Sequence, residues 1–244
     1  MQNYKITIQY DGTHYHGWQV QPNGRTIQGE LTRALSLLDH RHVTVHGAGR
    51  TDAGVHAEGQ VANFFLEHRF DLRILREAIN GNLDRDIRVI SVEEAADSFN
   101  ARFAARLKAY RYQIWTGPVV SPFLHRYVYH YRGELDVEQM RSAAIALVGR
   151  HDFRAFTSIH SDIEDHHRTL KRLDIEQRED GLTLVAEADG FLRYMVRTIA
   201  GTLIDVGRGR RAASTVAEIL YSRNRANAGA TAPAAGLTLM RVDY

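Results

Sequence analysis

The sequence contains no cysteine, and this absence excludes several kinds of chemistry. Disulfide bonds and thiolate metal sites cannot form, and a catalytic cysteine nucleophile is ruled out. The sequence also lacks any run of about 18 apolar residues, so we expect no membrane-spanning helix. The first twelve residues alternate like a strand and lack the basic and then apolar layout of a signal peptide. We therefore expect a cytoplasmic protein.

Lysine is scarce, and the charges of the two signs are nearly balanced. Only three of the 31 basic residues are lysine, and the net charge is +2. Residues 1–105 carry 11 basic and 13 acidic residues, whereas residues 106–244 carry 20 and 16 and include the clusters RTLKR (168–172) and RGRR (208–211). Arginine binds phosphate oxygens bidentately and stacks on bases, so this bias suits RNA, although genomic codon bias would also produce it.

The apolar periodicity predicts a similar order of elements in the two halves. In the first half we expect strands at 4–12, 42–49, 59–67 and 86–95. We also expect one helix that starts near Thr26 and a second helix over 71–83. In the second half we expect a strand at 108–117, a helix from Asp136 to about Val148, a hairpin at 170–190, helices at 191–207 and 214–221, and a strand at 237–244.

This order indicates two split βαβ (ferredoxin-like) halves, residues 1–105 and 106–244, although no residue-level repeat links them. The predicted class is α+β. We expect the halves to form one mixed, largely antiparallel sheet with helices on one side and a central cleft, where a ligand could bind.

The segment GAGRTDAGVHAEGQVANF (47–64) is the strongest candidate for chemistry. It places Arg50, Thr51 and Asp52 in a glycine-rich turn between two apolar strands, and glycines let the backbone bend tightly and let a ligand approach closely. An aspartate on such a turn can present its carboxylate to a cleft. The alternative is an Asx-turn, in which Asp52 hydrogen-bonds only to its own backbone.

GRTDAGVHA closely resembles the active-site signature of the tRNA pseudouridine synthase A family. Further segments resemble blocks of that family in the same order: HGWQVQP (16–22), FNARFAARLKAYRY (99–112), GRHDFRAF (149–156), FLRYMVRTIAGTLIDVGRGR (191–210) and TAPAAGLTLMRVDY (231–244). Two places depart from the pattern: Ala230 stands where proline is common, and residues 157–168 match poorly.

The resemblance implies an isomerase that converts uridine to pseudouridine at positions 38, 39 and 40 in the anticodon stem-loop of transfer RNA, without a cofactor. It implies that Asp52 is the essential aspartate and that Arg197 pairs with it. It also implies that Tyr110 lies against the target base and that Arg50 helps to hold the flipped-out nucleotide. A homodimer is implied as well.

Each of these residues also has an ordinary structural interpretation. Without the resemblance, Arg197 would be read as a solvated helix residue. Tyr110, Tyr112 and Ile114 alternate onto one face of a strand, so at least two of them are expected in the core. Histidines are scattered outside any HExxH frame, so we expect no metal site.

Two other functions compete with the isomerase. A non-catalytic RNA-binding or tRNA-folding module would use the arginine clusters and would not need Asp52. A glycosidase-like hydrolase would release free base, but such enzymes usually employ two carboxylates, and the motif region offers no second one. Whether Asp52 attacks the base, attacks the anomeric carbon or removes a ribose proton stays open.

Overall fold

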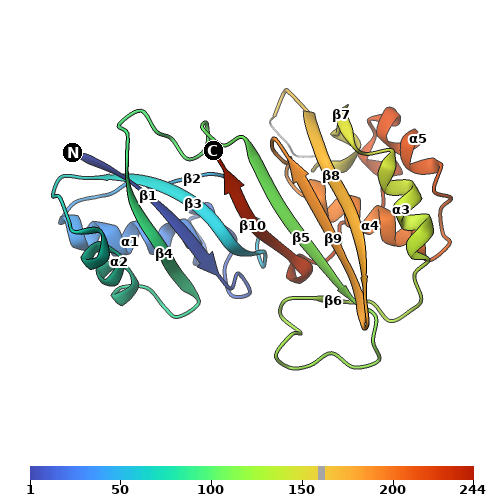
Figure 1. Cartoon of the computed structure of the whole chain (residues 1–244), viewed down its shortest axis with the longest axis horizontal. Helices are drawn as coiled ribbons and strands as arrows, with labels where there is room; N and C mark the ends of the chain where they lie inside the picture. Colours follow the sequence, from blue (N-terminus) through green and yellow to red (C-terminus); the bar gives the residue numbers. More distant parts are fainter. Residues whose placement is uncertain (159–162) are drawn as a thin grey trace. The chain divides into compact units, whose positions relative to one another are not determined.

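The computed structural model describes residues 1–158 and 163–244 and contains two compact units (Figure 1). Unit 1 comprises Met1–Arg106 together with Leu239–Tyr244, and unit 2 comprises Leu107–Thr238. The predicted α+β class with a mixed, largely antiparallel sheet is confirmed. Within the described ranges, no helix is both long and apolar enough to cross a bilayer.

Unit 1 has the strand order of a split βαβ fold. Its elements are β1 (Gln2–Tyr10), α1 (Ile27–Asp39), β2 (His46–Gly47), β3 (His56–Leu66), α2 (Leu72–Gly81) and β4 (Ile87–Ala95), together with most of β10 (Leu237–Asp243). The strands are ordered β4-β1-β3, with β2 also on β3, and these pairings are antiparallel. The first and third strands thus lie together at the centre, as expected for this motif.

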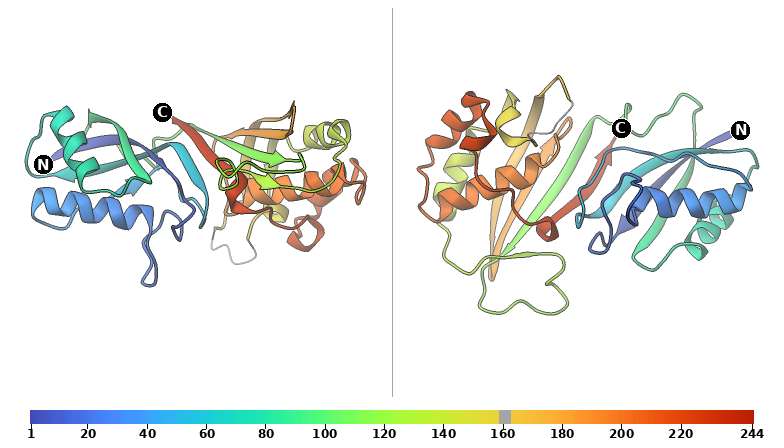
Figure 2. Two further views of the ribbon diagram at one scale, coloured as in Figure 1. Left: turned by 90° about the horizontal axis from the view of Figure 1, so that it is seen from below. Right: turned by 180° about the vertical axis from the view of Figure 1, so that it is seen from behind.

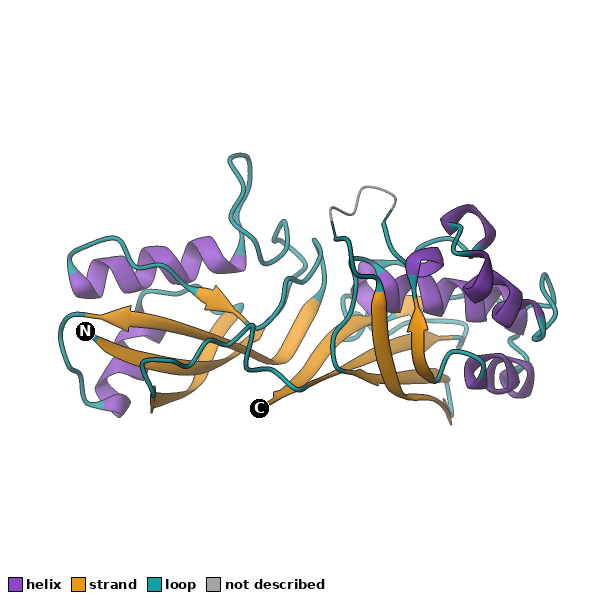
Figure 3. Cartoon of the chain, turned by 90° about the horizontal axis from the view of Figure 1, so that it is seen from above, coloured by secondary structure: helices purple, strands orange, loops and turns teal. Residues whose placement is uncertain are grey.

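Alternating burial along β1 and an apolar stripe along α1 build the core of unit 1. Tyr4, Ile6 and Ile8 are fully buried on one face of β1. Helix α1 covers one face of these strands (Figures 2 and 3), and it begins where the Thr26 hydroxyl accepts a hydrogen bond from the amide of Gly29. This cap satisfies an amide that has no partner within the helix.

The predicted strand at 42–49 is wrong over most of its length, because only His46–Gly47 is extended and paired. The residues before it bond to side chains of α1 instead. The amide of Val43 donates to Ser36 Oγ (3.0 Å), and the carbonyl of Val45 accepts from Gln28 Nε2 (2.9 Å). The apolar alternation therefore reflects packing against a helix and not a sheet ladder.

Unit 2 consists of strands and packed helices. Its elements are β5 (Leu107–Trp115), β6 (Tyr129–His130), α3 (Val137–Ile145), β7 (Gly149–Asp152), β8 (His167–Arg178), β9 (Gly181–Ala188), α4 (Met195–Gly207) and α5 (Thr215–Ser222), with 3₁₀ turns at Arg154–Phe156, Arg225–Asn227 and Ala234–Gly236. The strands are ordered β5-β9-β8-β7, with β6 parallel to β5. Helix α4 covers one face of β5, β9 and β8 (Figure 2).

Two predicted helices of unit 2 are shorter than expected. Helix α4 begins at Met195 and not at residue 191, because Tyr194 has a left-handed conformation (φ 65°) that breaks the helical path. Helix α3 ends at Ile145, and tight turns then lead to Gly149 (φ 118°), which starts the unpredicted strand β7.

Candidate active site

Asp52 lies in the connection between β2 and β3, on a turn closed by main-chain hydrogen bonds. Its side chain is half-buried. The carbonyl of Asp52 accepts from the amide of Val55 (3.1 Å), and the amide of Gly54 donates to the carbonyl of Tyr15 (3.3 Å). Gly54 has φ 77°, a conformation that is costly for any residue with a side chain. The glycine-rich sequence therefore produces the sharp turn that the motif predicted.

The loop after β1 supports this turn at close range. The amide of Trp18 donates to the carbonyl of Thr51 (3.0 Å), and the Trp18 side chain is buried. Gly17 (φ 87°) leaves no space at all, since a Cβ there would lie 2.5 Å from the carbonyl oxygen of Thr51 and 3.0 Å from the carbonyl carbon of Asp52. The backbone of the HGW segment (16–18) therefore packs directly on the backbone of the RTD segment (50–52).

A buried polar cluster lies behind the same turn. The Tyr10 hydroxyl is 2.8 Å from Thr51 Oγ1, and Gln60 Nε2 donates to the carbonyl of Gly49 (3.0 Å). Burial raises the pKa of Tyr10 to about 12, against the opposing effect of its hydrogen bonds to Thr51 and Gln60. Tyr10 and Gln60 carry no distinguishing signal in the sequence, because both belong to segments that resemble ordinary core strands.

Tyr110 lies in β5 and is 7% exposed. Its ring packs edge to face with Phe191, with the ring centroids 5.1 Å apart. Tyr112 and Ile114 are buried as well, so the expectation of core residues on this face of the strand is confirmed. The Tyr112 hydroxyl donates to the carbonyl of Pro233 (2.9 Å), and burial raises the pKa of Tyr112 while the positive charge of Arg197 opposes that shift.

Arg197 is in the first turn of α4 and is half-buried. Its Nε donates to the carbonyl of Ala232 (2.8 Å), and its own carbonyl accepts from the amide of Ala232 (3.1 Å). The guanidinium carbon lies 5.3 Å from the centre of the Tyr194 ring, within the range of a cation–π interaction. The interpretation of Arg197 as a solvated helix residue is therefore wrong, because this side chain is held in a defined direction.

Arg50 is exposed on the Asp52 turn, and within the described residues its side chain makes no hydrogen bond or ion pair. Unit 1 thus provides Asp52 and Arg50, whereas unit 2 provides Tyr110 and Arg197. In the part of the chain that the structure describes, no three histidine, aspartate or glutamate side chains are grouped as metal ligands.

The two basic clusters of the second half are partly neutralised by neighbouring carboxylates. Arg172 contacts Asp174 through Nε (2.5 Å) and Glu187 through Nη1 (3.6 Å). Arg208 and Arg211 both pair with Asp205. Their charge is therefore less available to RNA than the sequence alone suggests, because a phosphate must compete with these carboxylates.

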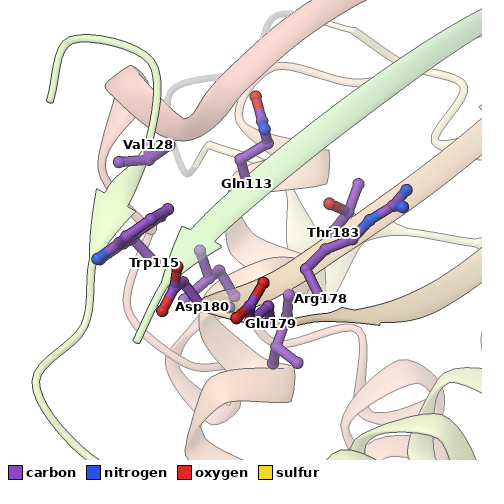
Figure 4. Close-up of a pocket in the computed structure, with 10 residues that line it drawn as sticks. Gln113, Trp115, Val128, Arg178, Glu179, Asp180 and Thr183 are labelled. Carbon is purple, nitrogen blue, oxygen red and sulfur yellow. The ribbon is translucent and has the colours of Figure 1, made fainter. Parts of the chain in front are cut away.

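A cavity of about 240 Å³ in unit 2 is lined by none of the four predicted site residues, which are Arg50, Asp52, Tyr110 and Arg197. It lies at the turn between β8 and β9, and Figure 4 shows Trp115, Arg178 and Asp180 among the side chains around it. Trp115 Nε1 donates to the carbonyl of Val119 (3.0 Å), so the polar atom of this indole is already engaged. We do not assign the cavity to the candidate active site.

Comparison with known proteins identifies the family. The sequence profile of the tRNA pseudouridine synthase family matches residues 6–104 and 143–244. The chain is 44% identical over 253 aligned positions to "tRNA pseudouridine synthase A 1" of Protochlamydia amoebophila, covering 100% of this chain and 97% of that protein. It is 43% identical to "tRNA pseudouridine synthase A" of Brevibacillus brevis, with 100% of both chains covered. The predicted resemblance and isomerase class are confirmed: the chain belongs to the tRNA pseudouridine synthase family.

Proposed function

We propose that this protein isomerises uridine to pseudouridine at positions 38, 39 and 40 in the anticodon stem-loop of transfer RNA, and that Asp52 is its catalytic carboxylate. The observation that carries the proposal is the match to tRNA pseudouridine synthases over the whole chain, together with a half-buried aspartate on a rigidly supported turn. We further propose that the enzyme acts as a homodimer in the cytoplasm.

The reaction moves the uracil ring without net oxidation or addition. The bond from ribose to the ring nitrogen breaks, a bond from ribose to ring carbon-5 forms, the proton on carbon-5 leaves, and the freed ring nitrogen takes up a proton from water. One carboxylate can serve this sequence as a nucleophile on the base, a nucleophile on the anomeric carbon, or a base toward a ribose proton. All three routes require ionised Asp52, and none needs an external redox or methyl-donor cofactor.

The other three residues have separate roles in the proposal. Arg197 supplies the positive charge that favours ionised Asp52 and fixes the direction of its carboxylate. Tyr110 lies against the target base, which must leave its stack at a cost of a few kcal/mol. An aromatic contact recovers about 1–3 kcal/mol of that cost. Arg50, which is exposed beside Asp52, holds the flipped-out nucleotide.

The test is release of tritium from transfer RNA labelled at uracil carbon-5. We expect wild-type protein to release tritium without added cofactor and Asp52→Asn to be about 10³-fold slower or worse, because the substitution removes only the charged carboxylate. Transfer RNA binding, measured by gel shift, should change by less than about threefold. Asp97→Asn makes the same change at an exposed position of unit 1 and should retain full activity.

Other outcomes would point elsewhere. Full tritium release by Asp52→Asn would contradict the proposed role of this residue. No release by wild type, with RNA binding intact, would instead favour the non-catalytic RNA-binding module. If wild-type protein releases tritium, transfer RNAs that carry uridine at only one of positions 38, 39 and 40 will define the modified sites.

A further inference from the structure

Tyr10 reaches the back of the Asp52 turn because the sheet is irregular at that point. Along β1 and β3, Ile8 is paired with Gln60, but Tyr10 is paired with Ala57, so β3 contains one extra residue between the two pairs. A bulge of this kind redirects neighbouring side chains. The Tyr10 side chain is buried and lies beside Trp18, with ring centroids 6.4 Å apart.

The hydrogen bonds of Tyr10 and Gln60 hold the chain on both sides of Arg50. Gln60 is fully buried, and its Nε2 donates to the carbonyl of Gly49 (3.0 Å) and, over a longer distance, to the Tyr10 oxygen (3.4 Å). Because the Tyr10 oxygen accepts this bond, its own proton is available for Thr51 Oγ1 at 2.8 Å. Thr51 directly precedes Asp52, so the cluster ends one residue from the proposed catalytic carboxylate.

We propose that Tyr10 is a positioning residue that holds the Asp52 turn in its reactive geometry through the hydroxyl of Thr51. This inference rests on the proposed function of Asp52. The cluster is buried, so water does not replace a lost bond, and the turn has to reorganise around the unpaired groups. Displacement of a reacting group by about 1 Å can slow a reaction by about 10²-fold.

The burial of Tyr10 and the engagement of its hydroxyl by Thr51 and Gln60 favour a positioning role over proton transfer. Burial keeps its pKa at about 12, so the phenol remains protonated at neutral pH. Tyr10→Phe should therefore lower the rate by the same factor at every pH between about 6 and 9. A proton-transfer role would instead change the shape of the pH profile.

The first experiment compares Tyr10→Phe with Tyr4→Phe by steady-state tritium release. Tyr4 is a fully buried tyrosine of the same strand, and its hydroxyl accepts from the amide of Phe70 (3.1 Å) instead of bonding to the Asp52 turn. We expect kcat of Tyr10→Phe to fall about 10- to 100-fold, with KM for transfer RNA changed by less than about threefold. Tyr4→Phe should keep the wild-type kcat even if its melting temperature falls as far as that of Tyr10→Phe.

A second pair of variants keeps the test independent of how well Tyr10→Phe folds. Thr51→Val removes the hydroxyl at nearly constant volume and should reproduce the loss of kcat, whereas Thr51→Ser retains the hydroxyl and should restore kcat to within about threefold of wild type. A wild-type kcat in both Tyr10→Phe and Thr51→Val, or equal losses in Tyr10→Phe and Tyr4→Phe, would overturn the inference. These results are distinct from failure of the proposed function, in which wild type or Asp52→Asn itself behaves unexpectedly.

Discussion

At Gly17, the absence of a side chain allows two loops to touch. A methyl group there would overlap the carbonyl of Thr51, and the positive φ of 87° is itself unfavourable for alanine. We expect Gly17→Ala to lose about 1–3 kcal/mol of unfolding free energy and to lower kcat at least about tenfold, because the Asp52 turn must move. Chemical denaturation and tritium release measure the two effects.

Gly149→Ala is the matched control for this prediction. Gly149 also has a positive φ (118°), but the three nearest atoms to a Cβ there all belong to the half-buried ring of His151 in unit 2, and not to the Asp52 turn. The backbone cost of about 1 kcal/mol should therefore appear without a loss of kcat. Equal losses of kcat in both variants would show that general destabilisation, and not the contact with the turn, slows the reaction.

Between elements, Asp39 connects the end of α1 to the end of β3. Its buried carboxylate accepts from Arg41 Nε (2.6 Å) and from the amides of Glu67 (3.1 Å) and His68 (3.4 Å). Burial raises the pKa of Asp39, but these hydrogen bonds outweigh that effect and hold the pKa below its ordinary value of 3.8. The ionised form therefore stabilises the folded state.

The pH dependence of stability follows from the direction of this shift. The unfolded chain binds the Asp39 proton more tightly, so the stabilisation is present above about pH 4 and is lost as the pH falls through the lower pKa of the folded state. Asp39→Asn should cost about 1–3 kcal/mol at pH 7, because an amide nitrogen replaces one acceptor, and less at pH 3. Urea denaturation at the two pH values tests this, and a cost that does not shrink at low pH would refute it.

At the scale of the whole molecule, the last six residues return to the first unit. Leu239–Tyr244 belong to unit 1, where the carbonyl of Asp243 accepts from the amide of Arg106 (2.8 Å) and the Tyr244 hydroxyl donates to the carbonyl of Ala101 (3.0 Å). A Cβ on Gly59 would lie 2.3 Å from the carbonyl oxygen of Met240, so β3 and β10 approach closely there. Unit 1 is therefore completed by residues remote in sequence.

Deletion of residues 239–244 should destabilise unit 1 selectively. We expect amide hydrogen exchange in β1 and β3 to accelerate by about tenfold or more, while β8 and β9 exchange at nearly the wild-type rate, since local stability follows local contacts. Mass spectrometry of the exchanged peptides resolves the two units. An equal acceleration in both units, or none in unit 1, would contradict this assignment of the C-terminal segment.

Much of the architecture and the position of the catalytic candidate follow from local sequence patterns. Caps such as Thr26, the apolar stripe of α1 and the glycine-bounded turn at Asp52 depend on residues close together in the chain, so they are readable without coordinates. The expected strand at 42–49 was wrong because apolar alternation does not reveal whether a segment's backbone bonds to a strand or to helix side chains.

Local sequence patterns specify the family, the order of the longer helices and strands and the glycine turn that carries Asp52, because these are encoded by neighbouring residues and recognisable motifs. The contacts that support that turn arise from tertiary packing: the close approach of Gly17, the redirection of Tyr10 by a bulge, and the buried bond from Gln60. The Tyr10–Thr51 contact joins residues 41 apart, and the Gln60–Gly49 bond joins residues 11 apart across the turn. They depend on strand register and side-chain direction, which no local pattern specifies.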